Sequence, residues 1–455
     1  MHDKEKDMNR LNTLLLSATL MAGTAWQSIS AQVVYVEDDE DDVVVKDKEG
    51  NDETIKVPEA MLQDLDSLLS QYHAKIYLKP DETCNMRDVN PYFAPEEYQD
   101  RLKRLPTIIE MPYNDVVQKF IDRYATKLRR SVSMMLGASN FYMPVFEQAL
   151  ETFNVPLELK YLPVIESALN PNAVSRVGAT GLWQFMITTG KQYGLKVNTL
   201  VDERRDPTKA SYAAAHYLSD LYRIFGDWTL VIAAYNAGPE NINKAIHRAG
   251  GAKDYWQIYP YLPAETRGYV PAFIAANYIM NYYCEHNICP MVTTLPIKTD
   301  TVMVNKDLHL RQVADVLNVD IEQLRAINPQ YRKDVINGYG EPSALRLPQD
   351  IVNAFIDNED SIYVYQKETL LPKRATVVLD ESVVASVTRS SVSRSGKATR
   401  SKRGKASRRS KTVTIRQGDT LSEIARRNHT TVAKLKRLNR ISGNNIRAGK
   451  KIKVK

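Results

Sequence analysis

Residues 155–171 read Val-Pro-Leu-Glu-Leu-Lys-Tyr-Leu-Pro-Val-Ile-Glu-Ser-Ala-Leu-Asn-Pro, an apolar run of helical character that ends at Glu166. Four aliphatic residues surround this acid in the sequence: Leu159, Leu162, Val164 and Ile165. A carboxyl group in apolar surroundings is costly to ionise, so we expect the pKa of Glu166 to rise toward neutrality. A carboxyl that is protonated at neutral pH is what a general acid needs to protonate a leaving oxygen. Since a single Glu at a helix end is more commonly a surface residue, the neighbouring motifs must decide between the two interpretations.

The sequence that follows Glu166 contains no further acid before Asp202. A glycosidase with two carboxylates needs a second acid across the scissile bond. The missing neighbour therefore favours a mechanism with a single acid, although a carboxylate distant in the sequence could fold back into the site.

The N-terminus has the pattern of a secretory signal peptide. Three basic residues precede an apolar segment from Leu11 to about Ala25, and small residues follow up to Ala31. This segment is too short and too weakly flanked to predict a stable membrane span, and no Cys follows it that would predict a lipid anchor. No later segment reaches membrane-spanning length. We expect residues 1–31 to be a signal peptide and the mature protein to be exported to the periplasm or cell envelope, with no transmembrane segment.

The charge is divided unevenly along the chain. The formal net charge is +7, but residues 389–455 contain 22 Lys and Arg and only two acids, so the rest of the chain is net negative. A basic tail on an acidic body predicts a polyanionic partner or surface. Because the chain is expected to be exported, anionic polymers of the envelope are a better candidate than nucleic acid, which we do not expect as a partner. A simple solvated surface is the alternative.

Three cysteines, Cys84, Cys284 and Cys289, raise the question of disulfide pairing in an exported chain. Cys284 and Cys289 are close enough for a small-loop disulfide, which would leave Cys84 over. Three pairings are possible and the sequence does not choose among them. None of the cysteines has a partner at metal-site spacing, so no metal is expected.

Composition and pattern divide the rest of the chain into regions. An acidic segment and short hairpin are expected at 32–57, an N-terminal helical region at 58–139, a compact helical domain that contains Glu166 at 140–290 and a basic Ser/Arg/Lys-rich linker at 380–411. The linker has almost no large apolar residue, so it cannot bury a core.

A short motif occurs twice in the C-terminal third. Residues 310–328 and 421–439 share Leu, Ala, Leu and Asn at one offset without a gap, and each copy is flanked by short alternating apolar segments. Strand, helix, helix and strand within one small module, used twice, is the simplest interpretation. Chance similarity between two amphipathic helices is the alternative. The modules are expected at 300–350 and 412–455.

Several motifs together resemble the soluble-lytic-transglycosylase domain, and most closely the membrane-bound lytic murein transglycosylase D family. The motifs are Glu166-Ser167, Gly181-Leu-Trp-Gln184, Ala234-Tyr-Asn-Ala-Gly238 and Tyr269, in this order. The repeated module resembles the LysM domain, which accompanies this catalytic domain in that family. The resemblance implies a multidomain chain with a mainly α, goose-type lysozyme-like catalytic domain and small α+β (βααβ) LysM modules.

The resemblance also implies an activity. Such enzymes cleave the β-1,4 bond between N-acetylmuramic acid and N-acetylglucosamine in peptidoglycan glycan strands, without a cofactor. By analogy, Glu166 protonates the glycosidic oxygen and then takes the proton from the muramyl C6 hydroxyl, which leaves a 1,6-anhydro end. An intramolecular nucleophile removes the need for a second carboxylate that activates water. A muramidase that uses water and a non-catalytic wall-binding scaffold are the alternatives.

Roles for the other site residues follow from the same resemblance. Ser167 and Gln184 are expected to hold the acid and the substrate, Tyr235 and Asn236 to hydrogen-bond the acetamido group, and Tyr269 to position Glu166 or the sugar. Trp183 is interpreted equally as a wall of the groove or as a core residue.

The two LysM copies differ at the turn that borders the sugar groove in that family. The tail copy has the expected glycan-binding residues Gly418, Asp419 and Thr420, with Asn439 nearby. The first copy has Lys-Asp-Leu-His at 306–309 instead, so its fold is expected to be kept while its sugar binding stays open.

Overall fold

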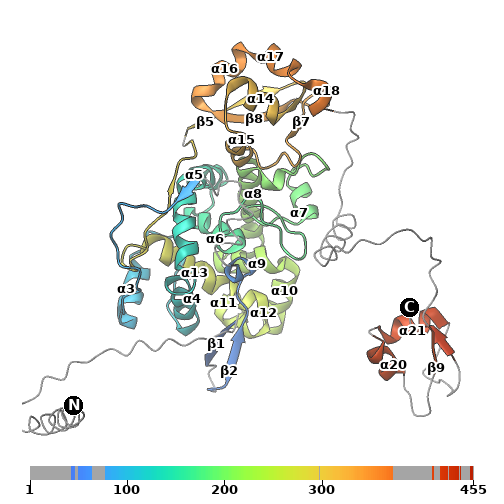
Figure 1. Cartoon of the computed structure of the whole chain (residues 1–455). Helices are drawn as coiled ribbons and strands as arrows, with labels where there is room; N and C mark the ends of the chain where they lie inside the picture. Colours follow the sequence, from blue (N-terminus) through green and yellow to red (C-terminus); the bar gives the residue numbers. More distant parts are fainter. Residues whose placement is uncertain are drawn as a thin grey trace, which may run out of the picture. The chain divides into compact units, whose positions relative to one another are not determined.

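Figure 1 shows the computed structural model of the chain. It describes residues 42–46, 50–63, 77–296 and 298–371 and, in the tail, 412–414, 421–428, 430–439, 441 and 451–453. The chain divides into two compact units, Met1–Arg389 and Ser390–Lys455. The expected signal peptide, most of the acidic run and the expected linker at 380–411 lie outside the described residues.

Helices make up most of the first unit between residues 95 and 281. They are α3 (Pro95–Arg104), α4 (Asp115–Ala125), α5 (Arg129–Thr152), η3 (Leu157–Tyr161), α6 (Leu162–Ser167), α7 (Ile187–Gln192), η4 (Glu203–Arg205), α8 (Pro207–Phe225), α9 (Trp228–Ala237), α10 (Pro239–Arg248), α11 (Tyr255–Ile258), η5 (Tyr259–Tyr261), α12 (Ala264–Arg267) and α13 (Tyr269–Asn281). The sequence explains several of their starts. Before α8, the Asp206 side chain accepts hydrogen bonds from the backbone N–H groups of Thr208 and Lys209, and Pro207 occupies the first turn.

Helix α13 lies at the centre of this helical body. Every residue from Tyr269 to Met280 is buried, and α4, α6 and α9 pack against it. A helix that is apolar on all sides is a core helix in a large domain. Because α13 is buried along its length, its first residue, Tyr269, is held in place by the rest of the helix.

Among the described residues, no helix has both the length and the apolar character needed to cross a membrane.

The expected boundary between residues 139 and 140 needs correction. It falls in the middle of α5, which runs without a break from Arg129 to Thr152. One continuous hydrophobic core contains buried residues from both sides of it, for example Phe120 and Ile121 of α4 together with Phe146 and Leu150 of α5. Because the two regions bury their apolar faces against each other, the N-terminal helices belong to the catalytic body.

The expected N-terminal hairpin is present and packs onto this body. Strands β1 (Val43–Lys46) and β2 (Asp52–Ile55) pair antiparallel, and η1 (Glu59–Leu62) follows and packs against α6. The Lys56 carbonyl lies so close to Gly268 that a Cβ there would be 2.2 Å from its oxygen. The Arg267 guanidinium also forms an ion pair with Glu53 at 2.7 Å. The N-terminal segment thus fixes the residues that immediately precede Tyr269.

The first module has the expected order of strand, two helices and strand. Strand β5 (Thr299–Val304) pairs antiparallel with β8 (Ser343–Pro348), and α14 (Leu310–Leu317) and α15 (Ile321–Ile327) lie between them in the chain. The structure adds elements that we did not expect: β4 (Val292–Thr293) before the module, β6 (Asp307–His309), β7 (Val335–Asn337), η6 (Gln349–Ile351), α16 (Val352–Asp357), α17 (Glu359–Val364) and α18 (Lys367–Leu370). Phe355 and Ile362 from the added helices are buried in the module's core, so the module extends past the expected end at 350.

The tail module repeats the same plan. Strands β9 (Thr412–Thr414) and β10 (Lys451–Lys453) pair antiparallel around α20 (Leu421–Arg427) and α21 (Val432–Asn439). Leu421, Ile424, Ala425, Leu435 and Ile452 form its buried core. The expected fold class, a mainly helical catalytic domain with small α+β modules, is confirmed.

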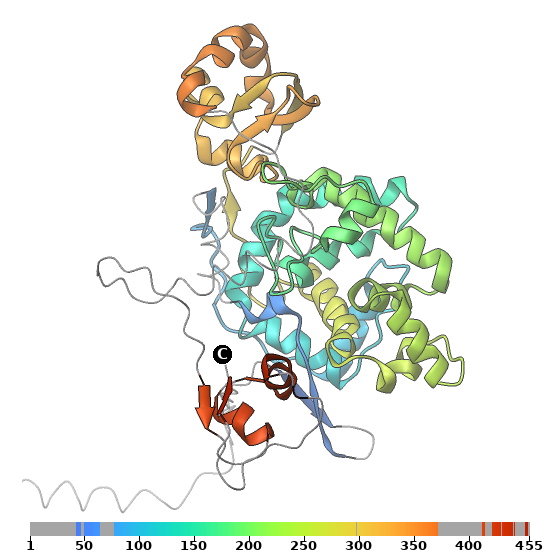
Figure 2. The ribbon, with the colours of Figure 1, turned by 90° about the vertical axis from the view of Figure 1, so that its right-hand side faces the viewer.

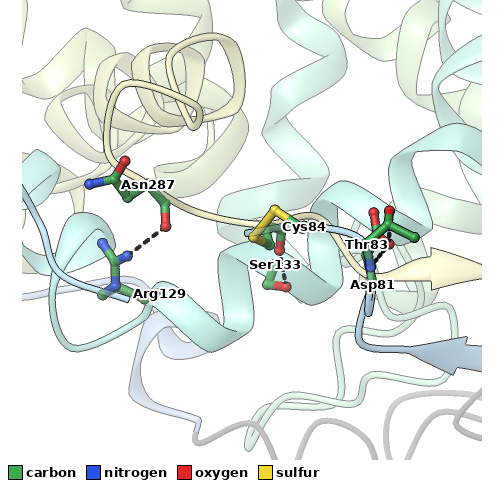
Figure 3. The surroundings of a disulfide bond; sticks show 7 residues. Asp81, Thr83, Cys84, Arg129, Ser133 and Asn287 are labelled. Atoms are coloured by element: carbon green, nitrogen blue, oxygen red, sulfur yellow. Dashed lines mark hydrogen bonds between the residues drawn. A yellow bond between two sulfur atoms is a disulfide. The ribbon is translucent and has the colours of Figure 1, made fainter. Parts of the chain in front are cut away.

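A disulfide between Cys84 and Cys289 ties the N-terminal region to the segment that follows α13. Figure 3 shows its surroundings, where the Arg129 guanidinium donates a hydrogen bond to the Asn287 carbonyl at 2.9 Å and the Ser133 hydroxyl donates to the Cys289 carbonyl. Nearby, β3 (Leu78–Lys79) pairs antiparallel with β4. Cys284 is exposed and unpaired. The sequence left three pairings open, and the structure has the pairing of the two cysteines that are farthest apart in sequence, Cys84 and Cys289.

We predict that Cys84→Ser lowers the free energy of unfolding by about 2–5 kcal/mol, because the bond closes a long loop in the unfolded chain. Its two cysteines are 205 residues apart. Denaturant titrations without reductant, followed by circular dichroism, measure the change. Cys284→Ser is the matched control and should leave the midpoint unchanged. A loss with Cys284→Ser and none with Cys84→Ser would contradict this pairing.

Candidate active site

A cleft of about 600 Å³ opens beside Glu166. Its walls come from parts of the chain that are far apart in sequence: the N-terminal segment, the end of α6 with the loop up to α7, α8, the end of α9, and α12 with the start of α13. The lining includes Lys56, Glu59, Leu62, Glu166, Arg176, Gln184, Met186, Tyr217, Tyr235, Asn236, Glu265 and Tyr269. The structure therefore gathers five of the expected catalytic-domain site residues, Glu166, Gln184, Tyr235, Asn236 and Tyr269, around one cleft.

Glu166 has the protonation behaviour expected from the sequence. Burial raises its pKa from the usual 4.5 to about 7, and a hydrogen bond from the Tyr269 hydroxyl to Oε1 partly offsets this rise. The immediate cause differs in part from the one we inferred. Leu159, Leu162 and Val164 belong to the core beneath α6, whereas the cleft around the carboxyl is lined by Ile165 and by tyrosines brought in from α8, α9 and α13. Glu166 is thus poised to be protonated or ionised near neutral pH.

Ser167 anchors the helix that carries the acid. Its side chain is 2% exposed, and its hydroxyl lies 2.9 Å from the Leu182 carbonyl and 3.1 Å from the Pro163 carbonyl. It does not line the cleft. The expectation that Ser167 also holds the substrate is therefore corrected: it ties α6 to the turn at 181–184, since its small hydroxyl faces the protein interior.

The chain turns sharply just after this serine. Ala168 and Leu169 both adopt left-handed backbone conformations, with φ of 49° and 59°, although neither is glycine. Such residues carry conformational strain and persist only where the surroundings hold them. Both side chains are buried, and the Ala168 and Leu169 N–H groups bond to the Val164 and Pro163 carbonyls. Their burial keeps α6 short and leaves Glu166 at its open end.

The turn containing Gly181 and Gln184 forms another wall of the cleft. Gly181 has φ of 88°, and a Cβ there would lie 1.8 Å from the Arg204 carbonyl oxygen. Gln184 also has a positive φ, 47°, and its side-chain amide donates to the Gly181 carbonyl at 2.8 Å. Trp183 is fully buried and its indole N–H donates to the Ser211 hydroxyl at 2.9 Å. The structure therefore supports the interpretation of Trp183 as a core residue and not as a wall of the groove.

Tyr235 and Asn236 lie at the end of α9 and face the cleft. The Tyr235 hydroxyl donates to the Trp183 carbonyl at 2.8 Å, which fixes its ring beside the turn at 181–184. The Asn236 side-chain oxygen accepts from the Thr266 hydroxyl at 3.0 Å. No hydrogen bond within the described residues engages its Nδ2 amino group, which leaves a donor for a bound group at the cleft.

Three other carboxylates, Asp42, Glu59 and Glu265, fold back to line the cleft. A like charge close to Glu166 would raise its pKa by Coulomb repulsion. The pKa of Glu166 responds only to burial and to the Tyr269 hydrogen bond, and Glu59 instead faces the Arg176 guanidinium at 3.7 Å. No carboxylate among the described residues thus acts as a close electrostatic partner of Glu166.

The contribution of the N-terminal segment was missed by sequence reasoning. Lys56, Glu59 and Leu62 line the cleft, and Glu59 reaches across to Arg176 in the loop that follows α6. Nothing in the sequence around residues 56–62 indicates this, because the contact depends on the hairpin packing onto a helix a hundred residues away. Tyr217 also lines the cleft and could have been predicted from the sequence, because it belongs to an Ala-rich helical motif that precedes Tyr235.

Comparison with known proteins agrees with these features. Residues 144–258 match the family model described as the transglycosylase SLT domain, residues 298–364 match the LysM-like domain of lytic transglycosylase MltD, and residues 413–455 match the LysM domain. A transglycosylase SLT domain combined with two LysM-type modules makes the chain similar to the lytic murein transglycosylases. The match to the catalytic family model ends before Tyr269 and begins after the N-terminal hairpin.

Two named relatives are similar to this chain in sequence. The chain is 28% identical to membrane-bound lytic murein transglycosylase D of Escherichia coli strain K12 over 352 residues, which cover 76% of this chain and 70% of the relative. It is 32% identical over 124 residues to the soluble lytic murein transglycosylase of the same strain, covering 26% and 19% of the two chains. Among solved structures, the 70 kDa soluble lytic transglycosylase of Escherichia coli is similar, with 27% identity, a TM-score of 0.28 and coverage of 32% of this chain and 25% of that one.

The expected sugar-binding residues of the tail module lie only partly within the described residues. Gly418, Asp419 and Thr420 lie outside the described residues. The Asn439 side chain is engaged with the backbone: its Nδ2 donates to the Leu435 and Lys453 carbonyls, and its Oδ1 accepts from the Lys453 N–H at 2.7 Å. The side chain of Asn439 therefore joins α21 to β10. This structural role explains why the motif has an asparagine at this position.

The raised pKa of Glu166 predicts a pH-dependent change in stability. Stability that the protonated form contributes is fully present below about pH 4.5 and is lost as pH rises through about 7. Because Gln resembles the protonated acid, we expect Glu166→Gln to raise the free energy of unfolding by about 2–3 kcal/mol at pH 8 and to leave it unchanged at about pH 4. Denaturant titrations at both pH values measure this. Glu265→Gln, at an exposed carboxylate of the same cleft, is the control, and an equal gain there would contradict the assignment.

Proposed function

We propose that this chain is an exported peptidoglycan lytic transglycosylase that cleaves the β-1,4 bond between N-acetylmuramic acid and N-acetylglucosamine and leaves 1,6-anhydromuramyl ends. The observation that carries the proposal is Glu166, a cleft carboxyl with a pKa of about 7 that receives a hydrogen bond from Tyr269. Similarity to the lytic murein transglycosylases supports the reaction class. The catalytic acid, Glu166, lies inside the residues that match the catalytic family model.

In the first half of the reaction, protonated Glu166 donates its proton to the glycosidic oxygen. The bond from that oxygen to C1 of the muramyl residue breaks, and positive charge develops at C1. In the second half, the ionised Glu166 carboxylate takes the proton from the muramyl C6 hydroxyl, whose oxygen attacks C1. The carboxyl is regenerated and no water is consumed. A pKa near the working pH suits a group that must both give and take a proton in one cycle.

The other cleft residues hold the substrate and the acid. Tyr269 donates to Glu166 and so stabilises the ionised form that accepts the C6 proton. Asn236, oriented by the hydrogen bond from Thr266, donates its amide N–H to the acetamido group. Tyr235 forms the adjoining wall, and its hydroxyl oxygen can still accept a hydrogen bond from the substrate. Gln184 also lines the cleft, in the turn that its own side chain stabilises.

We predict that Glu166→Gln reduces cleavage of isolated peptidoglycan by at least about 10²-fold, because Gln neither donates nor accepts the proton, while binding to the wall persists. Mass spectrometry of the soluble products identifies the reaction. Anhydromuramyl ends support the transglycosylase, and reducing muramic acid ends would show a muramidase that uses water. Undiminished cleavage by the Gln variant would remove Glu166 from its role, and no cleavage by the wild-type protein would favour a wall-binding scaffold.

The tail module is proposed to tether the enzyme to the wall, and its basic surface to contact anionic envelope polymers in the periplasm. Lys434, Arg437 and Lys453 are exposed on the described part of this module. The match of residues 413–455 to the LysM domain supports attachment to glycan strands. A tether of this kind raises the local concentration of glycan strands at the catalytic cleft.

We predict that a chain ending at Arg389, where the first compact unit ends, loses most of its binding to peptidoglycan sacculi but keeps its rate on short soluble glycan fragments. Both chains should carry Glu166→Gln in the binding assay, so that the sacculi stay intact. Added salt separates the two components, because charge attraction weakens with ionic strength while glycan recognition does not. Unchanged pelleting of the shortened chain would contradict the tether.

A further inference from the structure

We propose that the first LysM-like module is a fixed part of the catalytic domain, which positions the cleft turn (residues 178–185) through Asp202 and Arg204, and is not a second glycan tether. The inference uses the proposed function only for its activity readout. It rests on a continuous path of contacts from the module to the cleft.

The module is docked by backbone pairing. Val201 of the catalytic domain forms an antiparallel bridge with Tyr331, which lies between α15 and β8 of the module. The Asp202 N–H donates to the Gln330 carbonyl at 2.9 Å, and the Arg332 N–H donates to the Leu200 carbonyl at 2.9 Å. Backbone hydrogen bonds in both directions fix the register between the two segments.

Side chains reinforce the same junction. Val201 packs against the hydrophobic core of the module, and Gln330 and Tyr331 are 4% and 7% exposed. The Arg346 guanidinium donates to the Thr208 hydroxyl at 2.5 Å at the start of α8. An apolar contact inside a hydrogen-bonded frame is typical of packing within a domain, whereas a mobile tether would leave these groups to water.

Asp202 connects this junction to Arg204. Its backbone N–H is held by the module, and its carboxylate accepts from Arg204 Nε and Nη2, both at 2.9 Å. The two side chains are 2% and 3% exposed. A buried, two-pronged Arg–carboxylate pair has a strict geometry, and breaking it leaves an unpaired buried charge. The position of Asp202 therefore dictates that of the Arg204 guanidinium.

Arg204 in turn holds the cleft turn at both ends. Its Nη1 donates to the Gly178 carbonyl and to the Phe185 carbonyl, each at 3.0 Å. Its backbone carbonyl closes against Gly181, where no Cβ would fit. Gln184, which lines the cleft, lies between these fixed points. Arg204 is thus a positioning residue, and the module supports it from behind.

The two modules are therefore used differently. The segment between α15 and β8 of the first module is occupied by the catalytic domain, and Figures 1 and 2 show this module against the helical body in both views. The tail module belongs to a separate compact unit. We assign wall attachment to the tail module and support of the cleft to the first module.

The test is Val201→Asp in the full chain, with Val201→Ile as the matched control. A carboxylate at this apolar contact should undock the module, because it is costly to bury next to the module's core. Hydrogen exchange should show faster exchange of the Asp202 and Arg332 amides. We expect kcat on short soluble glycan fragments to fall by about 10–100-fold with little change in KM, since a small misplacement of catalytic groups has effects of this size. Binding to the wall, measured by pelleting, should be unchanged. The control Val201→Ile should give the wild-type value in every one of these measurements.

Several outcomes would overturn the inference. Faster exchange of both amides with unchanged kcat would show that the module does not position the cleft. Lost pelleting on the Glu166→Gln background with an intact tail would show that the module is a glycan tether. Should Val201→Asp fail to fold, Arg204→Lys replaces it: Lys keeps the charge beside Asp202 but lacks the fork that reaches both carbonyls, so kcat should again fall. Absence of cleavage by the wild-type protein would contradict the proposed function. Hydrogen exchange of the Asp202 and Arg332 amides would still show whether the module is docked on the catalytic domain.

Discussion

The desolvation of one carboxyl group, that of Glu166, is the constraint around which the catalytic body is arranged. Keeping a carboxyl out of water in a cleft that must still admit substrate requires walls from several directions. Helix α6 supplies the acid, α9 and α13 supply tyrosines, and the N-terminal segment covers the remaining side. Each wall is braced from behind: Ser167 ties α6 to the turn at Leu182, and Lys56 closes on Gly268 just before Tyr269. Loss of any one of these supports would admit water and lower the pKa of the acid.

Burial and hydrogen bonding act on Glu166 in opposite directions, and their balance sets its chemistry. Burial alone would raise the pKa further and keep the acid neutral, which would make it a poorer proton donor. The Tyr269 hydroxyl stabilises the carboxylate and brings the pKa down to about 7. The Tyr269 hydroxyl is itself a weak acid whose pKa is raised well above its ordinary value by burial and by the charge of Glu166, so it remains a donor throughout. One carboxyl and one phenol thus supply an acid and a base without a second carboxylate.

The sequence predicted those parts of the structure that depend on local pattern. The helical catalytic domain, the βααβ modules and the N-terminal hairpin follow from periodicity, the internal repeat and turn residues. The direction of the pKa shift of Glu166 was expected from its apolar neighbours, although only Ile165 among them lines the cleft. What escaped prediction depends on packing between distant segments. The boundary expected at 139/140 lies inside α5, because apolar residues on both sides share one core, and nothing local indicates that. Ala168 and Leu169 gave no signal for left-handed backbone, since neither residue favours it; only their burial holds them there.

The paired asparagines of the two modules show why a shared motif does not define a shared function. Asn328 and Asn439 occupy the same position in the repeat, and each joins its second helix to its last strand through the same three kinds of hydrogen bond, to Leu324 and Arg346 in the first module and to Leu435 and Lys453 in the second. An asparagine that satisfies this many backbone groups stabilises the fold in either context. The likeness between the modules is therefore a likeness of scaffold. Their roles diverge through the surroundings of that scaffold: pairing with Leu200–Asp202 commits the first module to the catalytic domain, whereas exposed basic side chains leave the second available to the wall.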